Sequence, residues 1–169
     1  MSDIEKALNL EVLRASFLDH TRAAYRLLPD LVRPRILDLG CGRGLPTLEI
    51  SQLSDGDIVA IDTDSAALAY LQARIEEADL SRQINVVHVS IYETGFPDGL
   101  FDVIWEEGVM HLLDSSRSLP ECRRLLKPGG FLVMHEDVTW FGSVQNPLRG
   151  FQNNGPPSRL NSGGRIPEN

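Results

Sequence analysis

The sequence has few cysteines and no long apolar run, and both shortages limit what the protein can be. Its 169 residues include two cysteines, Cys41 and Cys122, which lie far apart. Two such cysteines form neither a disulfide framework nor a set of zinc ligands, so we expect a reducing compartment and no metal site. No apolar stretch approaches the ~20 residues of a membrane-spanning helix. The start, MSDIEKALNL, lacks the pattern of a secretory signal, so a cytoplasmic protein is expected.

Positive charge is also scarce. The chain has 16 Lys and Arg against 24 Asp and Glu, a formal net charge of -8. A negative field repels phosphate backbones and anionic lipid surfaces, so neither a nucleic acid nor a membrane is an expected partner. The hydrophobic share of 42% is ordinary for a globular protein, and the length suits one domain with its own core.

Short apolar runs alternate with amphipathic helical patterns along most of the chain. The pattern predicts strands at residues 35–39, 58–61, 84–89, 101–105 and 131–134, with helices near residues 4–28, 46–53, 65–78 and 119–126. Continuous apolar strands between helices are typical of a parallel sheet covered on both faces. The expected fold class is therefore α/β, with a doubly wound and mostly parallel sheet.

The regular pattern stops near residue 137. We expect one ligand-binding domain over residues 1–137, in which residues 1–30 form a helical cap. Gly, Pro, Asn and Ser accumulate from residue 146 to residue 169. Residues 138–169 are therefore expected to form an irregular tail, which is a loop, a lid or a disordered segment.

A glycine-rich turn follows the first predicted strand and precedes a helix, in the segment Asp38-Leu39-Gly40-Cys41-Gly42-Arg43-Gly44. Glycines allow a ligand to approach the main chain closely, and in a doubly wound sheet this turn lies at the ligand-binding crevice. Asp62 ends the second predicted strand, at the spacing of a carboxylate that binds ribose hydroxyls. A nucleoside-bearing ligand is indicated. The alternative is that the glycines only make a tight turn.

The spacing of the glycines distinguishes between two kinds of nucleoside ligand. The turn reads G-x-G-x-G rather than the G-x-G-x-x-G of dinucleotide sites, and Asp38 precedes Gly40 by two positions. A carboxylate would repel a pyrophosphate but attract the cationic amino or sulfonium group of S-adenosylmethionine. This pattern argues against an NAD-dependent oxidoreductase and favours S-adenosylmethionine as the cofactor.

Four segments in order resemble motifs of the class I S-adenosylmethionine-dependent methyltransferases: ILDLGCGRG, IVAIDTD, FPDGLFDVIW and RRLLKPGGFLVM. Together they extend over roughly residues 35–136. The resemblance implies a Rossmann-like methyltransferase fold, whose sheet normally has seven strands with a reversed hairpin at one edge. Since only about thirty irregular residues follow the fifth strand, the C-terminal edge strands are expected to be absent. An edge exposed in this way favours pairing with another chain, for example with a second copy in a homo-oligomer.

The resemblance also implies roles for particular residues. In the family the acid after the third strand usually reaches the adenine amino group, and here Ser90 stands in its place, as either a neutral hydrogen-bonding partner or a surface turn residue. The predicted cofactor-binding residues lie in the glycine turn and at the ends of the second, third and fourth strands. They are Asp38, Gly40 and Gly42 near the methionine moiety, Cys41 in the same turn, Asp62 at the ribose, Thr63, Ser90 and Ile91 around the adenine, and Glu106.

Two residues, Glu106 again and His111, are candidates for chemistry at the methyl group. Glu106 ends the fourth strand and is predicted to contact cofactor or substrate, and His111 follows as the candidate base. In the competing interpretation, Glu106 accepts hydrogen bonds from backbone N–H groups and His111 is a helix-cap residue. His135 and Glu136, at the end of the fifth strand, are further candidates. The predicted function is methyl transfer from S-adenosylmethionine to a small-molecule acceptor; the alternative is a non-catalytic binding subunit or a truncated relic.

Overall fold

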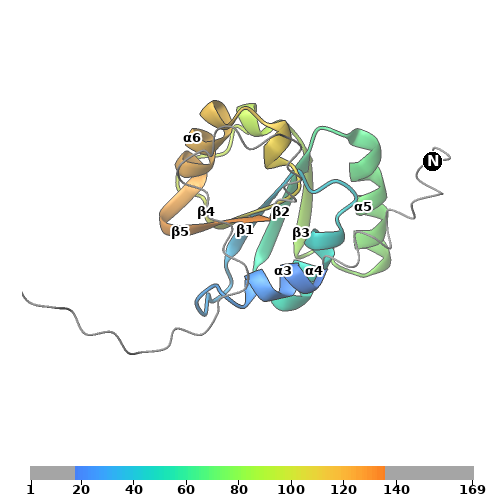
Figure 1. Ribbon diagram of the computed structural model, residues 1–169. Helices are drawn as coiled ribbons and strands as arrows, with labels where there is room; N and C mark the ends of the chain where they lie inside the picture. The colour runs from blue at the N-terminus through green and yellow to red at the C-terminus, as the bar shows by residue number, and fades with distance from the viewer. Residues whose placement is uncertain (1–17, 136–169) are drawn as a thin grey trace, which may run out of the picture. The chain divides into compact units, whose positions relative to one another are not determined.

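The computed structural model describes residues 18–135. In this part of the chain four α-helices, two 3-10 helices and five strands alternate (Figure 1). Their bounds are α3 Leu18–Tyr25, β1 Arg35–Leu39, α4 Leu45–Leu53, β2 Asp57–Asp62, α5 Ser65–Glu77, β3 Ile84–His88, η1 Ile91–Glu93, β4 Phe101–Glu107, η2 Met110–Leu112, α6 Ser115–Leu125 and β5 Leu126–His135.

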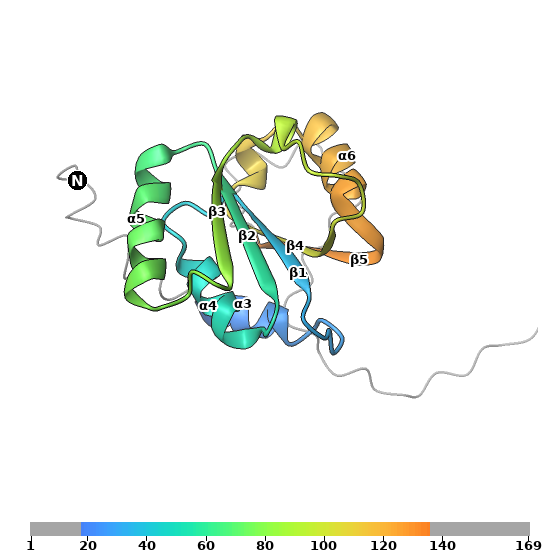
Figure 2. The same ribbon diagram turned by 180° about the vertical axis from the view of Figure 1, so that it is seen from behind.

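The five strands form one sheet in the order β3-β2-β1-β4-β5, and all four pairings are parallel. Because β1 lies in the centre, the chain first winds outward to β3 and then crosses back to β4 and β5 on the other side (Figure 2). This arrangement confirms the predicted doubly wound α/β fold. It also brings the carboxyl ends of all the strands to one edge, where ligands bind in such sheets.

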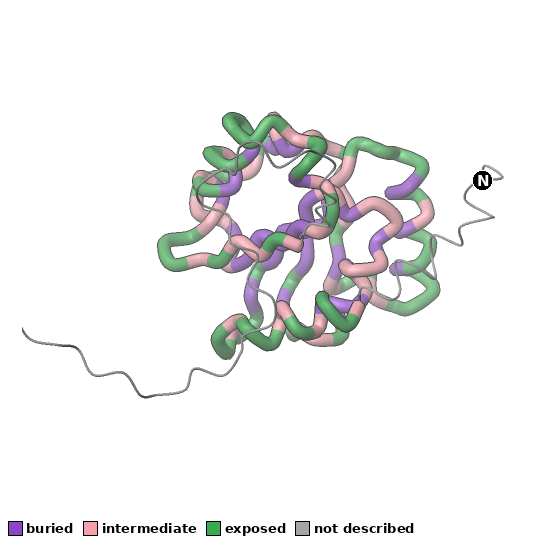
Figure 3. Tube along the Cα trace, viewed as in Figure 1, coloured by how far each residue is buried: buried purple, intermediate pink, exposed green. Residues whose placement is uncertain are grey.

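Side chains that alternate along each strand supply two separate cores. Ile36, Ile58 and Trp105 belong to the core beneath α3, α4 and α5, while their neighbours Leu37, Val59 and Ile104 belong to the core beneath α6. The buried central strands and the exposed outer helix faces are seen in Figure 3. Parallel strands covered on both faces need apolar residues at nearly every position, which is the pattern the sequence shows.

Local signals set most of the helix starts. Asp64 caps α5 by accepting hydrogen bonds from the backbone N–H groups of Ala66 and Ala67, as the sequence predicts. Helix α6 begins at Ser115, earlier than expected, because Asp114 caps it through the N–H of Ser116. Strand β5 also begins earlier than residue 131, since Leu126 already pairs with Phe101 before the Lys127–Gly130 bulge.

Strand β5 lies at the edge of the described sheet, and its side chains Phe131 and Met134 are exposed. Three predictions fall wholly or mostly outside the described residues: the tail at residues 138–169, the candidate Glu136 and most of the N-terminal cap. The domain limits and the homo-oligomer therefore stay predictions. Within residues 18–135 no helix is both long enough and apolar enough to cross a membrane.

Candidate functional site

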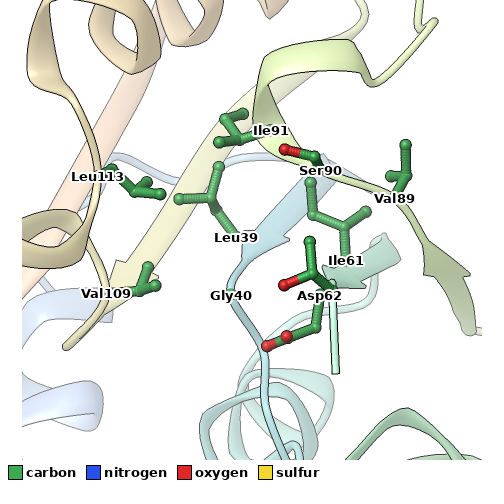
Figure 4. A pocket seen from close by; sticks show the side chains of 10 residues that line it. Leu39, Gly40, Ile61, Asp62, Val89, Ser90, Ile91, Val109 and Leu113 are labelled. Carbon is green, nitrogen blue, oxygen red and sulfur yellow. The ribbon is translucent and has the colours of Figure 1, made fainter. Parts of the chain in front are cut away.

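A pocket lies at the carboxyl edge of the sheet, where β1, β2 and β3 end (Figure 4). Its walls are mostly apolar and its rim is polar. In Figure 4, Val109 and Leu113 stand on one side and Asp62 and Ser90 on the other. The lining residues are Leu39, Gly40, Ile61, Asp62, Thr63, Val89, Ser90, Ile91, Val109 and Leu113. An apolar slot with a few polar groups at its mouth suits a flat ring that carries hydrogen-bonding substituents.

The glycine turn is tied to the end of β2 through its main chain. The N–H groups of Gly40 and Cys41 both donate to the carbonyl oxygen of Ile61, at 2.9 and 3.0 Å. The N–H of Gly42 donates to Asp62 Oδ2 at 2.8 Å. The glycines at 40, 42 and 44 all have φ between 52° and 78°, a region that other residues rarely adopt. The turn therefore depends on glycine for its shape and on Asp62 for its position.

Gly40 also permits a close approach by the segment after β4. A Cβ atom at Gly40 would lie 2.6 Å from Cγ1 of Val109, whereas one at Gly42 would meet no described atom within 4 Å. Val109 thus packs directly over the turn and narrows the pocket to a cavity of about 70 Å³. Since small-molecule sites usually enclose roughly 300–1,000 Å³, only part of a nucleoside fits within these walls.

Five of the predicted cofactor residues meet at this pocket: Gly40, Asp62, Thr63, Ser90 and Ile91. Asp62 holds two backbone N–H groups, that of Gly42 on Oδ2 and that of Asp64 on Oδ1. Ser90 caps the short η1 helix, because its Oγ accepts a hydrogen bond from the N–H of Tyr92 at 3.2 Å. Both side chains therefore support the loops that shape the pocket, and both reach its surface.

Asp38 lies on the face of β1 opposite to that of its neighbour Leu39, which lines the pocket, since neighbouring residues of a strand point in opposite directions. It is 2% exposed, and its Oδ2 accepts a hydrogen bond from Thr47 Oγ1 of α4. The pKa of this carboxyl is raised from 3.8 to about 7. Burial is the main cause; the hydrogen bond from Thr47 works against it, and the charges of Glu107, Asp62 and Glu106 add to it. Asp38 is therefore a buried carboxyl that titrates near neutral pH.

Cys41 is buried in the core beneath α4 and α5. Burial strongly raises the pKa of its thiol, which keeps the sulfur protonated and unreactive. Among residues 18–135 there is no group of three His, Cys, Asp or Glu side chains that could hold a metal ion.

The two residues predicted for chemistry differ in their exposure to solvent. Glu106 is fully buried, and its Oε1 accepts hydrogen bonds from the N–H groups of Val109 and Met110 at 2.5 and 2.8 Å. This carboxylate therefore sets the path of the segment that covers Gly40. His111 is exposed on η2. Roles for Glu106 and His111 at a methyl group stay predictions.

Sequence reasoning predicted Ile91 but missed the other apolar walls of the pocket. Leu39, Ile61 and Val89 stand at or just beyond strand ends, a signal the sequence already contained. Val109 and Leu113 had no local signal, because only the path of the segment after β4 brings them over β1.

Residues 37–134 match the model of a family described as a methyltransferase domain. One relative is the 27-O-demethylrifamycin SV methyltransferase of Amycolatopsis mediterranei, which is 28% identical over 109 residues. The match covers 64% of this chain and 40% of that protein. A probable S-adenosylmethionine-dependent methyltransferase of Mycobacterium tuberculosis is also 28% identical, over 146 residues, covering 85% of this chain and 51% of that one. This chain thus spans about half or less of these relatives.

Two solved structures share the fold. The [4+2]-cyclase SpnF has a TM-score of 0.67 and 27% identity, covering 70% of this chain and 44% of its own. The geranyl diphosphate C-methyltransferase of Streptomyces coelicolor, solved with geranyl diphosphate and S-adenosyl-L-homocysteine, has a TM-score of 0.64 and 18% identity. That match covers 69% of this chain and 44% of the other.

Proposed function

Because the chain belongs to the methyltransferase domain family, we propose that it binds S-adenosylmethionine at the carboxyl edge of the sheet and transfers the methyl group to a small-molecule acceptor. The observation that carries this proposal is the position of Asp62. Its carboxylate stands at the mouth of an apolar slot and is held there by two backbone N–H groups.

The residues around the slot fit the parts of the cofactor. Ile61, Ile91 and Leu113 are apolar surfaces for an adenine ring. Thr63 and Ser90 place oxygens at the rim, and a carboxylate such as that of Asp62 accepts hydrogen bonds from ribose hydroxyls. When bound, the sulfonium of the cofactor would supply an activated methyl group. The protein then mainly has to orient the acceptor, since positioning alone provides much of the rate of such a displacement.

Asp38 suits the cationic end of the same ligand. It is a buried carboxyl at the end of the central strand, surrounded by the negative charges of Glu107, Asp62 and Glu106. A cation brought next to this group would relieve the repulsion. The small-molecule acceptor is supported by the names of the relatives, one a rifamycin methyltransferase and another a geranyl diphosphate methyltransferase.

Titration calorimetry with S-adenosylmethionine, S-adenosylhomocysteine and NAD tests the binding half of this proposal. We expect both adenosyl ligands to bind and NAD to give no heat. Asp62→Ala should weaken both adenosyl ligands by about 1–3 kcal/mol, because a charged hydrogen-bond acceptor is lost. Asp57→Ala is the matched control, since Asp57 is an exposed acid at the opposite end of the same strand. Tight NAD binding without a response to the adenosyl ligands would overturn the proposal.

A second candidate is ligand binding without methyl transfer. It is favoured by one observation: SpnF, at 27% identity, is named for a cyclisation. Incubation with S-adenosylmethionine and a panel of hydroxyl- and amine-bearing small molecules separates the two candidates. Release of S-adenosylhomocysteine that depends on an added acceptor supports the transferase. Its absence across the panel, in protein that binds the cofactor, supports the second candidate.

A further inference from the structure

Two segments that lie far apart in the sequence both line the pocket. Ser90 and Ile91 belong to the start of η1, whereas Val109 and Leu113 belong to the segment between β4 and α6 (Figure 4). The whole of β4 separates the two segments in the chain. The width of the pocket between them therefore depends on the contacts that hold one segment to the other.

Tyr92 connects the two segments directly. It follows Ile91 in η1, and its hydroxyl oxygen accepts a hydrogen bond of 2.7 Å from the backbone N–H of Asp114, the residue after Leu113. The two bonded residues are 22 positions apart in the chain. This bond joins the neighbours of two pocket residues, so it lies one residue away from each wall.

Asp114 offers this N–H because it is the N-cap of α6. The first N–H groups of a helix, that of the cap included, have no acceptor within the helix. The carboxylate of Asp114 accepts hydrogen bonds from the N–H and the hydroxyl of Ser116, at 3.0 and 2.6 Å. Its own N–H is satisfied by Tyr92 from outside the helix. The start of α6 is thus fixed from two directions, and Leu113 with it.

The ring of Tyr92 is itself held in place. The guanidinium carbon of Arg117, in the first turn of α6, lies 4.2 Å from the centre of the ring, which is a cation–π contact. The N–H of Tyr92 donates to Ser90 Oγ at 3.2 Å. Tyr92 is therefore bound at its backbone, its ring and its hydroxyl, and the distance between η1 and the start of α6 has little freedom.

Further contacts join the segment after η1 to α6, but they lie away from the pocket. Thr94 Oγ1 donates to Glu121 Oε1 at 3.0 Å, and Arg124 donates to the carbonyl oxygen of Phe96 at 2.7 Å. Glu121 and Arg124 belong to the second half of α6. These bonds hold the far part of the helix and leave the position of Leu113 to the bond from Asp114 to Tyr92.

We propose that Tyr92 is a positioning residue that fixes the width of the slot, and that the slot thereby selects an unsubstituted purine ring. The inference rests on the proposed function, because it takes the adenine of the cofactor as the ring that enters the slot. The cavity of about 70 Å³ leaves little room for groups added to that ring. A wall that is held in place discriminates by size, whereas a wall that moves outward accepts a larger ring.

Titration calorimetry on the full chain tests this inference, with S-adenosylhomocysteine and its analogues methylated at purine N6, C2 or C8. We expect the native protein to bind the parent ligand about tenfold or more tightly than at least one analogue, the scale on which a pocket rejects an added methyl group. Tyr92→Phe keeps the ring for Arg117 but removes the acceptor of the Asp114 N–H. It should reduce that preference about threefold or more.

Thr94→Val is the matched control, since it removes a side-chain bond to α6 away from the pocket. Thr94 is buried, so this substitution should lower the urea midpoint of unfolding at least as much as Tyr92→Phe. The preference for the parent ligand should nevertheless stay that of the native protein. Hydrogen exchange at the amide of Asp114, measured without ligand, should be faster in Tyr92→Phe than in the control.

The outcomes separate this inference from the proposed function. If the parent ligand binds but the native protein does not distinguish the analogues, or Tyr92→Phe keeps the native preference, the inference is wrong. It is also wrong if Thr94→Val reduces the preference as much as Tyr92→Phe does. If none of the ligands binds while exchange at Asp114 still responds to Tyr92→Phe, the proposed function itself fails and the inference falls with it. A reduced preference confined to Tyr92→Phe supports the assignment.

Discussion

The glycine turn beside the pocket is held to the end of β2 through its main-chain N–H groups, whereas the polar group at the ends of β4 and β5 is held by side chains from distant segments. At the glycine turn, Gly40, Cys41 and Gly42 bond to the end of β2 through their N–H groups. In the polar group, Glu107 is bonded to Thr21, 86 residues earlier in the chain. A contact made by the main chain of a turn leaves a spacing signal in the sequence, while a contact between side chains from distant segments does not.

The largest effect of these substitutions is expected at Gly40, where the segment after β4 packs against the glycine turn. Gly40→Ala should lower the free energy of unfolding by about 2–4 kcal/mol, because it adds strain at φ 70° to a clash with Val109. Gly42→Ala adds strain alone and should cost about 1–2 kcal/mol. Urea unfolding measures both. Val109→Ala should recover part of the loss in the Gly40→Ala background only, and equal costs for the two glycines would contradict this account.

An intermediate effect, dependent on pH, is expected at Asp38. Its pKa is about 7 in the folded protein against an ordinary 3.8, so between these values the folded form holds a proton that the unfolded form has lost. Stability should therefore fall as pH rises from about 4 to about 7 and then level off.

Asp38→Asn cannot titrate, and it keeps an acceptor for the hydroxyl of Thr47. It should gain roughly 1–3 kcal/mol over the native protein at pH 8 and little at pH 4. Thermal unfolding across this pH range measures the difference. A gain that is the same at both pH values would show that the carboxyl does not titrate in this window.

The smallest effect is expected at Thr21, in the polar group at the ends of β4 and β5. Thr21→Val has nearly the same shape but loses the hydrogen bond to Glu107, and it should destabilise the protein by about 1 kcal/mol. Thr21→Ser keeps the hydroxyl and serves as the control. If urea unfolding gives valine and serine the same cost, the hydroxyl contributes nothing and only the packing of the buried Thr21 side chain matters.

The fold was largely predictable because its signals are local. Apolar runs, Pro46 in the first turn of α4 and Asp64 as the cap of α5 indicated the elements from neighbouring residues alone. The start of β5 was predicted wrongly, since the Pro128-Gly129-Gly130 run indicates a turn, whereas Leu126 already pairs with Phe101 before it. The pocket residues on strand ends followed from the parallel sheet, but Val109 and Leu113 did not.

The sequence by itself determined the order of the elements, the glycine turn and the acid that ends β2, because each of these is encoded within a few adjacent residues. Tertiary structure decided which face each acid takes. Asp38 is buried and accepts a hydrogen bond from Thr47. Glu106 accepts a hydrogen bond from the N–H of Val109, which packs against Gly40, and Glu107 lies beside His135. Neighbouring positions on a strand have similar local sequence but point to opposite faces, so only the packed sheet assigns them their partners.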